Sequence, residues 1–283
     1  MAFELTNIGV IKELFLRHGF SFTKSLGQNF LINPSVCPKI AEQGGCGESV
    51  CALEIGTGIG VLTRELAARC EKVVAVEIDR GLQPILEETL AEFDNVEVIF
   101  EDVMEADLLR IIGEKFGGRD VVVCANLPYY ITSPVIMRVL ESRLPVKSMT
   151  VMVQREAADR ICAAPGTREC GALSYAVNYY SVPKMLFKVN RGSFMPAPNV
   201  DSAVIHLDIR EERLLPEDEE KTLFRLIRAG FSQRRKQLLN PLSAELHKTK
   251  TEVSELLQSA GINPLARAEE LSLEDYIRLA KMI

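Results

Sequence analysis

The run Val121-Val122-Val123-Cys124-Ala125-Asn126-Leu127-Pro128-Tyr129 is the stretch of sequence that decides the fold. Its first five residues are apolar and rich in β-branched side chains, and a proline follows, which is typical of a buried parallel strand. Open α/β sheets bind their ligands at the carboxyl ends of such strands. We therefore expect an α/β protein with a largely parallel sheet, in which Asn126, Leu127, Pro128 and Tyr129 lie at the mouth of a cleft.

These four residues carry groups that suit a flat amine such as the 6-amino group of adenine. The Asn126 side-chain oxygen and a backbone carbonyl of Leu127 or Pro128 can accept its two N–H bonds, which draws the nitrogen lone pair out of the ring. Tyr129 can stack on the base, an interaction worth about 1–3 kcal/mol. A strand-ending turn with a local asparagine hydrogen bond explains the same residues equally well. The interpretation therefore depends on other segments.

A glycine-rich turn, Gly56-Thr57-Gly58-Ile59-Gly60, follows another apolar strand over residues 50–55. Glycines in such a turn let the backbone pass close to a ligand. Val61 stands where a dinucleotide-binding fingerprint needs a small residue, so a pyrophosphate suits this turn poorly. Glu54, just before the turn, instead favours a ligand with a zwitterionic amino-acid end and a sulfonium, such as S-adenosylmethionine.

Acidic residues end the next two predicted strands. Glu77, in the strand over 73–79, can accept both hydroxyls of a ribose, and Asp102, after the strand over 96–100, can accept from an adenine amino group. Either acid alone is typical of a solvated strand end. Together with Gly56 and Asn126 they form a series at the tips of four strands. We expect these four tips to converge on one cleft.

The rest of the chain predicts a fifth strand over 148–153, a closing β-pair over 185–189 and 203–209, and then helices. Phe194 lies between the paired strands in a proline-rich loop. From the sequence it looks exposed; such a residue is usually a plug over the core, although it can also form the second face of a base sandwich. An acidic run then begins a helical region, which places a domain boundary near 211–216.

Composition indicates a globular protein without a membrane segment or a metal centre. The 283 residues are 47% hydrophobic and 25% charged, which is ordinary for a globular chain. Charges interrupt the first 20 residues and no apolar run approaches the length of a membrane span, so we expect a cytoplasmic protein with no membrane partner. Seven cysteines without a C-x-x-C pair and three scattered histidines predict reduced thiols and no metal site.

The net charge of −6 argues mildly against a nucleic-acid partner. The acidic excess lies before residue 184, where there are 24 acidic and 17 basic residues. Residues 184–283 contain 15 acidic and 16 basic residues. The densest basic cluster is Arg234-Arg235-Lys236, preceded by Arg225 and Arg228. A solvated basic surface and a contact with an RNA backbone both explain this cluster.

Taken in order, these motifs resemble the ribosomal RNA adenine dimethyltransferase family, and within it the bacterial members that act on 16S rRNA. One departure is Thr57, where the family commonly has proline. The resemblance covers almost the whole chain and is carried by Lys24-Ser25-Leu26-Gly27-Gln28-Asn29-Phe30-Leu31, Glu54-Ile55-Gly56-x-Gly58-x-Gly60-x-Leu62-Thr63, Ala75-Val76-Glu77-Ile78-Asp79, Asn126-Leu127-Pro128-Tyr129, Phe194-x-Pro196-x-Pro198-x-Val200-Asp201-Ser202 and Phe231-Ser232-Gln233-Arg234-Arg235-Lys236.

The resemblance implies a Rossmann-like class I methyltransferase domain over residues 1–211, with a mostly parallel seven-stranded sheet and helices on both faces. A small C-terminal all-helical domain that binds rRNA follows over 212–283. The implied reaction converts two adjacent adenosines, in a 3′-terminal stem-loop of 16S rRNA in the immature 30S subunit, to their dimethyl forms. It consumes S-adenosylmethionine, produces S-adenosylhomocysteine and serves ribosome biogenesis. We expect the enzyme to be a monomer.

The resemblance also implies roles for individual residues. The methyl donor is surrounded by Asn29, Leu31, Gly56, Gly58, Glu77, Asp102 and Asn126. The reacting amine is held at Asn126, Leu127 and Pro128, with Tyr129 and Phe194 flanking the base. Our candidates for contact with the rRNA backbone are Arg234, Arg235 and Lys236.

Other functions are compatible with parts of this pattern. Methylation of a 23S rRNA adenine, as in the resistance methylases, and methylation of DNA adenine remain alternatives. The long C-terminal helical region and the Phe-x-Pro-x-Pro loop favour the small-subunit enzyme over both. A non-enzymatic assembly or transcription factor that keeps the fold is a third alternative, against which the intact Asn126-Leu127-Pro128-Tyr129 motif argues.

Overall fold

The computed structural model describes residues 4–22 and 26–283. The chain divides into two compact units, and each is discontinuous in sequence. The first contains the chain up to Ala158 together with Lys184–Ile209, and the second contains Asp159–Pro183 and Arg210–Ile283. The division at Ile209 lies close to the predicted boundary. Residues 159–183, which the sequence analysis placed in the first domain, group instead with the helical unit.

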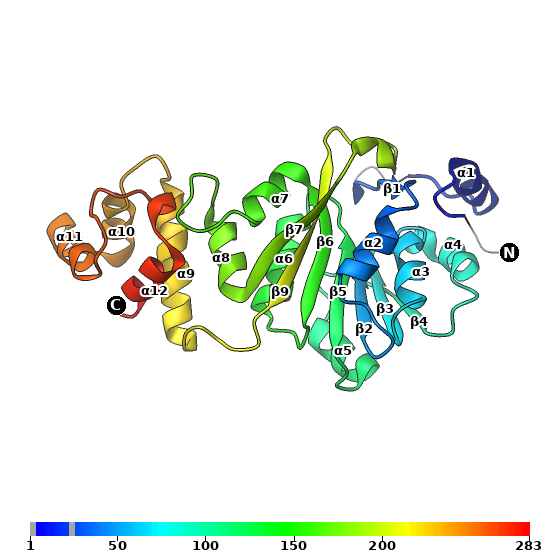
Figure 1. Cartoon of the computed structure of the whole chain (residues 1–283), viewed down its shortest axis with the longest axis horizontal. Coiled ribbons are helices and arrows are strands. Elements are labelled where there is room, and N and C mark those ends of the chain that lie inside the picture. Colours follow the sequence, from blue (N-terminus) through cyan, green and yellow to red (C-terminus); the bar gives the residue numbers. More distant parts are fainter. Residues whose placement is uncertain (1–3, 23–25) are drawn as a thin grey trace. The chain divides into compact units, whose positions relative to one another are not determined.

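A seven-stranded sheet forms the centre of the first unit (Figure 1). In spatial order its strands are β4 (Val96–Phe100), β3 (Lys72–Glu77), β2 (Cys51–Ile55), β5 (Val121–Asn126), β6 (Ser148–Gln154), β9 (Ser202–Ile209) and β7 (Ser181–Val189). The first five run parallel, and β9 runs antiparallel to β6. The predicted class of fold is therefore confirmed. The strand order reverses between β2 and β5, which is the switch point where such sheets bind ligands.

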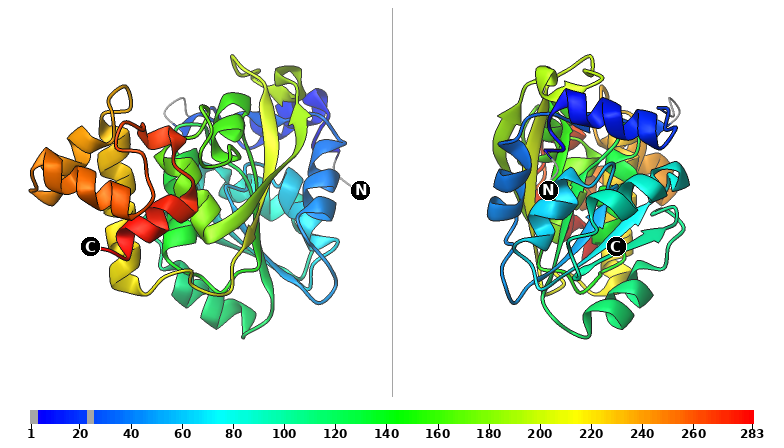
Figure 2. Two further views of the ribbon diagram at one scale, coloured as in Figure 1. Left: turned by 60° about the vertical axis from the view of Figure 1, so that its left-hand side comes forward. Right: turned by 90° about the vertical axis from the view of Figure 1, so that its right-hand side faces the viewer.

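Helices cover both faces of this sheet (Figure 2). The helices and 3₁₀ turns of the first unit are α1 (Ile8–Arg17), α2 (Val36–Gln43), α3 (Val61–Ala67), the 3₁₀ turn η2 (Arg80–Leu82), α4 (Gln83–Thr89), α5 (Leu108–Phe116), α6 (Thr132–Glu141), α7 (Arg155–Ile161), which continues into the second unit, and the 3₁₀ turn η3 (Arg191–Ser193). Buried side chains such as Ile40 on α2 and Leu66 on α3 pack with Ala52 and Cys124 of the sheet. The apolar runs that predicted the strands thus form this core.

A small second sheet joins two segments that are far apart in sequence. Strand β1 (Phe30–Leu31) pairs antiparallel with β8 (Phe194–Met195), so that Leu31 lies opposite Phe194. Residues 24 and 25 of the motif over 24–31 lie outside the described ranges, and the motif ends in this strand. The pairing brings the N-terminal segment next to the Phe-x-Pro-x-Pro loop.

The second unit is helical. Its elements are α8 (Ala172–Tyr180), α9 (Glu217–Ser232), α10 (Leu239–Leu246), α11 (Lys250–Ser259), the 3₁₀ turn η4 (Ala268–Glu270) and α12 (Leu273–Ala280). The buried carboxylate of Glu220 on α9 accepts hydrogen bonds from the hydroxyls of Tyr179 at 3.1 Å and Tyr180 at 2.8 Å. Buried hydrogen bonds to a charged group are among the stronger ones, and these two hold α8 against α9. In the first unit, no helix was predicted over Leu108–Phe116, where α5 lies.

Three further observations bear on the expectations from composition. All seven cysteines are free, and five of them are buried. Within residues 4–22 and 26–283 no helix is both long enough and apolar enough to cross a membrane. Over the same ranges, histidine, cysteine and acidic side chains do not gather into a group suited to a metal ion.

Candidate active site

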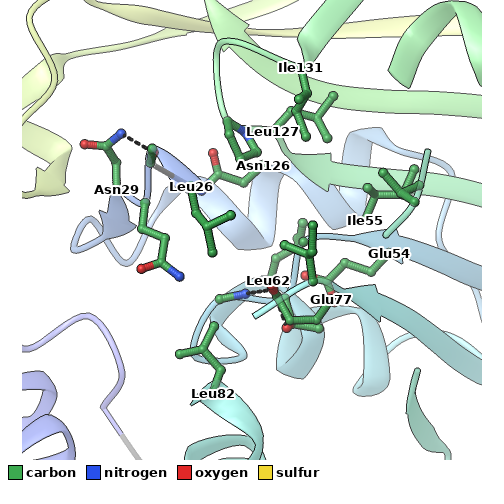
Figure 3. A pocket seen from close by; sticks show the side chains of 18 of the residues that line it. Leu26, Asn29, Glu54, Ile55, Leu62, Glu77, Leu82, Asn126, Leu127 and Ile131 are labelled. Atoms are coloured by element: carbon green, nitrogen blue, oxygen red, sulfur yellow. Dashed lines mark hydrogen bonds between the residues drawn. The ribbon is translucent and has the colours of Figure 1, made fainter. Parts of the chain in front are cut away.

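A cavity of about 210 Å³ opens at the carboxyl ends of β2, β3, β4 and β5 (Figure 3). Parallel pairing aligns these ends, because Ile55 lies opposite both Val76 and Ala125, and Glu77 lies opposite Phe100. Residues 26–31 add a further wall. The cavity contains every residue that the sequence analysis assigned to the methyl donor or the target base: Asn29, Leu31, Gly56, Gly58, Glu77, Asp102, Asn126, Leu127, Pro128, Tyr129 and Phe194.

The glycine-rich turn between β2 and α3 needs its glycines for both backbone shape and space. Gly58 and Gly60 have φ values of +54° and +91°, which other residues rarely adopt. A Cβ atom on Gly58 would lie 3.4 Å from the Phe30 ring, and one on Gly60 would lie 3.1 Å from the Leu90 side chain. The turn can therefore present its backbone directly to the cavity.

Glu77 at the tip of β3 is only 5% exposed and is held by the same turn. Its Oε2 accepts hydrogen bonds from Gly58 N at 3.1 Å and from Thr57 Oγ1 at 3.0 Å, and its Oε1 accepts from Asp79 N at 2.9 Å. Thr57, the departure from the family pattern, is buried. It adds a hydroxyl donor that proline could not supply.

Glu54 at the end of β2 is buried without a partner. It is 1% exposed, and neither carboxylate oxygen accepts a hydrogen bond from the described residues. Burial, reinforced by the negative charge of Glu77, raises the pKa of Glu54 to about 8, and the neighbouring Thr63 hydroxyl offsets only part of this effect. Glu54 directly precedes the glycine-rich turn in sequence, but it was not among the predicted site residues.

The Asn126 motif lies across the cavity from Leu82 (Figure 3). Asn126 is the last residue of β5, and no group among the described residues hydrogen-bonds to its side-chain amide. The Pro128 carbonyl accepts from Ile131 N at 3.1 Å and from Thr132 Oγ1 at 3.4 Å, where α6 begins. The sequence suggested either the Leu127 or the Pro128 carbonyl as the acceptor for a ligand. Because the Pro128 carbonyl already accepts two hydrogen bonds, the Leu127 carbonyl is the better candidate.

The two aromatic residues of the predicted base site differ in their surroundings. Tyr129 is half-buried and its hydroxyl shares a 2.7 Å hydrogen bond with Ser202 Oγ, which fixes the ring. Burial raises the pKa of the Tyr129 phenol, and the Ser202 bond partly offsets this. Phe194 is only 4% exposed, so the exposed appearance of its loop in the sequence was misleading, and the residue is buried as a plug over the core would be. The β1–β8 pairing and its packing with Leu31 bury it, yet it still lines the cavity.

Asn29 and Asp102 each use one polar atom to hold their own loop. Asn29 Nδ2 donates to the Gly27 carbonyl at 2.9 Å, and Asp102 Oδ1 accepts from Met104 N at 2.8 Å. The other Asp102 oxygen accepts no hydrogen bond from the described residues. Both side chains are thereby oriented while keeping an oxygen for a ligand.

Several further residues line the cavity without having been predicted: Leu26, Gln28, Glu54, Leu62, Ile78, Leu82, Val103, Met104, Tyr130 and Ile131. Ile78 and Val103 directly follow the two strand-end acids, so their position in sequence was a usable signal. Gln28 carried no such signal. Its carboxamide donates to Asp79 Oδ2 at 2.6 Å, which ties the N-terminal segment to the tip of β3.

The basic cluster lies in the second unit. Helix α9 ends at Ser232, so Arg234, Arg235 and Lys236 follow it in an exposed turn. Arg234 donates a hydrogen bond to the Arg168 carbonyl. In the described ranges none of the three cations forms an ion pair. Arg225 and Arg228 lie earlier on α9, and Arg225 Nε is 3.5 Å from Glu245 Oε1.

Comparison with known proteins supports the resemblance seen in the sequence. Residues 19–283 match the family model for ribosomal RNA adenine dimethylase. The chain is 48% identical over 270 residues to the ribosomal RNA small subunit methyltransferase A of Alkaliphilus oremlandii, which covers 95% of this chain and 94% of that protein. It is 45% identical to the protein of the same name from Geobacillus thermodenitrificans, over 99% of this chain and 97% of the relative.

Two solved structures share the fold. A dimethyladenosine transferase from Plasmodium falciparum superposes with a TM-score of 0.74 and 26% identity, covering 88% of this chain and 95% of its own. The 23S rRNA methyltransferase ErmE superposes with a TM-score of 0.70 and 27% identity, covering 89% and 98%. The fold is therefore shared by a dimethyladenosine transferase and by an enzyme whose name specifies 23S rRNA.

Proposed function

The chain belongs to the ribosomal RNA adenine dimethylase family, and we propose that this enzyme dimethylates the 6-amino groups of two adjacent adenosines in the 3′-terminal stem-loop of 16S rRNA. S-adenosylmethionine is the methyl donor and S-adenosylhomocysteine the product. One observation carries the proposal: Asn126, whose side-chain amide is unpartnered among the described residues, and Leu127 line the same cavity as the glycine-rich turn and the strand-end acids.

The donor half of the cavity fits this cofactor. Gly56 and Gly58 bring backbone to its wall, and Asn29 and Leu31 close the side formed by the N-terminal segment. Glu77 accepts hydrogen bonds from the ribose hydroxyls of the donor, and Asp102 accepts from the amino group of the donor's adenine. Glu54 supplies a buried negative group for the cationic amino-acid end. When bound, the donor provides an electrophilic methyl group on its sulfonium sulfur.

The target half of the cavity fits a flipped adenine. The Asn126 side-chain oxygen and the Leu127 carbonyl accept the two amine N–H bonds and direct the nitrogen lone pair toward the methyl group. Tyr129 and Phe194 contact the two faces of the base. Catalysis then comes mostly from positioning, which can contribute several kcal/mol. No general base is needed, because the methylated ammonium loses its proton to water.

The second unit supplies the proposed rRNA contact through Arg234, Arg235 and Lys236. An exposed basic turn without ion pairs is suited to phosphate groups, whose counterions it releases on binding. A base in a loop is also easier to extrude than one in a duplex. The proposed substrate is 16S rRNA in the immature 30S subunit, bound by a cytoplasmic monomer that takes part in ribosome biogenesis.

Methyl transfer to three purified substrates tests this function. Radiolabelled S-adenosylmethionine is incubated with the protein and either immature 30S particles, 50S particles or adenine-containing duplex DNA. We expect label only in 30S particles, at up to four methyl groups per particle, on two adjacent adenosines. Label in 50S particles would instead support 23S rRNA methylation, the activity named for the structural relative ErmE. Tight binding to 30S particles without any label would support a non-enzymatic assembly factor.

A further inference from the structure

The most unusual group in the molecule is the Glu54 carboxyl. It is 1% exposed, lines the cavity, and has two oxygens that accept no hydrogen bond from any described residue. A buried, unpaired carboxylate is so costly that such a group takes up a proton instead. Figure 3 shows the Glu54 side chain beside that of Glu77, a second carboxylate.

The groups that face Glu54 give it no positive partner. Glu77 reaches it from β3, the Cys37 thiol from α2 and the Thr63 hydroxyl from α3, while Cys124 of β5 is its neighbour in the sheet. Glu54 forms no ion pair with a lysine, arginine or histidine of the described residues. Burial raises the pKa of Cys37, so that thiol also stays neutral. The site therefore lacks one positive charge.

We propose that Glu54 is protonated in the free protein and exchanges its proton for the ammonium group of the donor's amino-acid end. This inference rests on the proposed use of S-adenosylmethionine. An ammonium group offers three N–H donors, which can satisfy both unpartnered oxygens of Glu54. A sulfonium sulfur carries positive charge but no hydrogen-bond donor, so it cannot satisfy them.

The exchange makes donor binding depend on pH in a defined direction. A carboxyl whose pKa is about 8 is about nine-tenths protonated at pH 7. Binding at pH 7 should therefore release about 0.9 proton per donor, and affinity should rise about ninefold from pH 6 to pH 7. Over this range an α-amino group, with an ordinary pKa near 8, stays largely protonated. The donor itself then contributes little to the change.

Isothermal titration calorimetry in phosphate and in Tris measures the released proton, because the two buffers differ in ionisation enthalpy. We expect equal release with S-adenosylmethionine and S-adenosylhomocysteine, which share the ammonium group, and none with methylthioadenosine, which lacks it. These three titrations need only the wild-type protein. Glu54→Gln should abolish the release and the pH dependence, whereas Glu65→Gln, a control on the outer part of α3, should leave both unchanged.

The possible results separate this inference from the proposed function. Donor binding without proton release, release that persists in Glu54→Gln, or release with S-adenosylmethionine alone would each overturn the proton exchange while leaving the methyltransferase assignment intact. Complete failure of the wild-type protein to bind S-adenosylmethionine would overturn the proposed function itself, and the exchange with it.

Discussion

Glu77 Oε2 accepts a hydrogen bond from the backbone N–H of Gly58 at 3.1 Å. The acid at the tip of β3 therefore supports the glycine-rich turn after β2 and lines the donor cavity at the same time. A substitution at Glu77 should therefore change both the stability of the protein and its affinity for the donor.

Glu77→Gln should weaken S-adenosylmethionine binding about tenfold, a change of about 1.4 kcal/mol. The amide keeps one accepting oxygen, so it retains the bond to either Gly58 N or Asp79 N and loses the other, at a cost of about 1–3 kcal/mol in stability. Calorimetric titration and thermal unfolding of the same sample measure both effects. Glu87→Gln, on the exposed side of α4, is the control that should change neither. Unaltered donor affinity in Glu77→Gln would remove Glu77 from the site.

Asn126→Ala should reduce kcat far more than it reduces donor affinity. The amide orients the amine in the transition state, and loss of one such group costs about 10²–10³ in kcat. Single-turnover methylation of 30S particles gives the rate, and titration of the same variant gives the donor Kd, which should change less than about threefold. If rate and affinity fall equally, Asn126 binds the donor instead of aiming the amine.

Substitutions at Tyr129 separate the ring from its hydroxyl. Tyr129→Phe keeps the stacking face and loses only the bond to Ser202, so kcat/KM for 30S particles should change little. Tyr129→Ala loses base stacking, worth about 1–3 kcal/mol, and should lower kcat/KM about 5- to 140-fold. Similar losses in both variants would show that the hydroxyl, and not the aromatic face, is what the reaction uses.

Neutralising Arg235 and Lys236 together should flatten the salt dependence of 30S binding. Each phosphate contact contributes about 0.7–0.9 to the slope of log K against log salt, so the double glutamine variant should lose about 1.5. Binding is measured by filter retention at several salt concentrations. The variant Lys250→Gln with Lys281→Gln removes equal charge elsewhere in the helical unit and should keep the slope. Equal flattening in both variants would mean that general charge, and not this turn, attracts the RNA.

Arg234 should behave differently from its two neighbours, because its guanidinium holds the Arg168 carbonyl. Arg234→Gln should lower the Tm, whereas the Arg235 and Lys236 variant should not. Differential scanning calorimetry distinguishes the two. A Tm equal to that of the wild type in Arg234→Gln would indicate that this contact does not contribute to folding.

The buried acid also predicts how stability changes with pH. The pKa of Glu54 rises from an unfolded value of 4.5 to about 8 in the folded protein. Between these values the unfolded chain binds fewer protons than the folded one, so the ligand-free protein loses stability as pH rises from 4.5 to 8, by a few kcal/mol in order of magnitude. Glu54→Gln should therefore raise the Tm at pH 8 and leave it nearly unchanged at pH 5. An equal shift at both pH values would contradict a neutral Glu54.

The sequence was sufficient for the class of fold and for the convergence of Gly56, Glu77, Asp102 and Asn126 on one cavity. Apolar β-branched runs mark buried parallel strands, and parallel strands align their carboxyl ends, so residues directly after them must meet. Local spacing could also have predicted α5, since Leu108, Ile111, Ile112 and Phe116 follow a helical period and Asp107 caps its first turn through Arg110 N.

The tertiary structure alone decided the state of individual groups. Pairing of β1 with β8 buries Phe194, which its proline-rich loop had suggested to be exposed, and the start of α6 occupies the Pro128 carbonyl and leaves that of Leu127 open. Burial beside Glu77 makes Glu54 a neutral acid. These properties arise from contacts between residues distant in sequence, which no local pattern of side chains records.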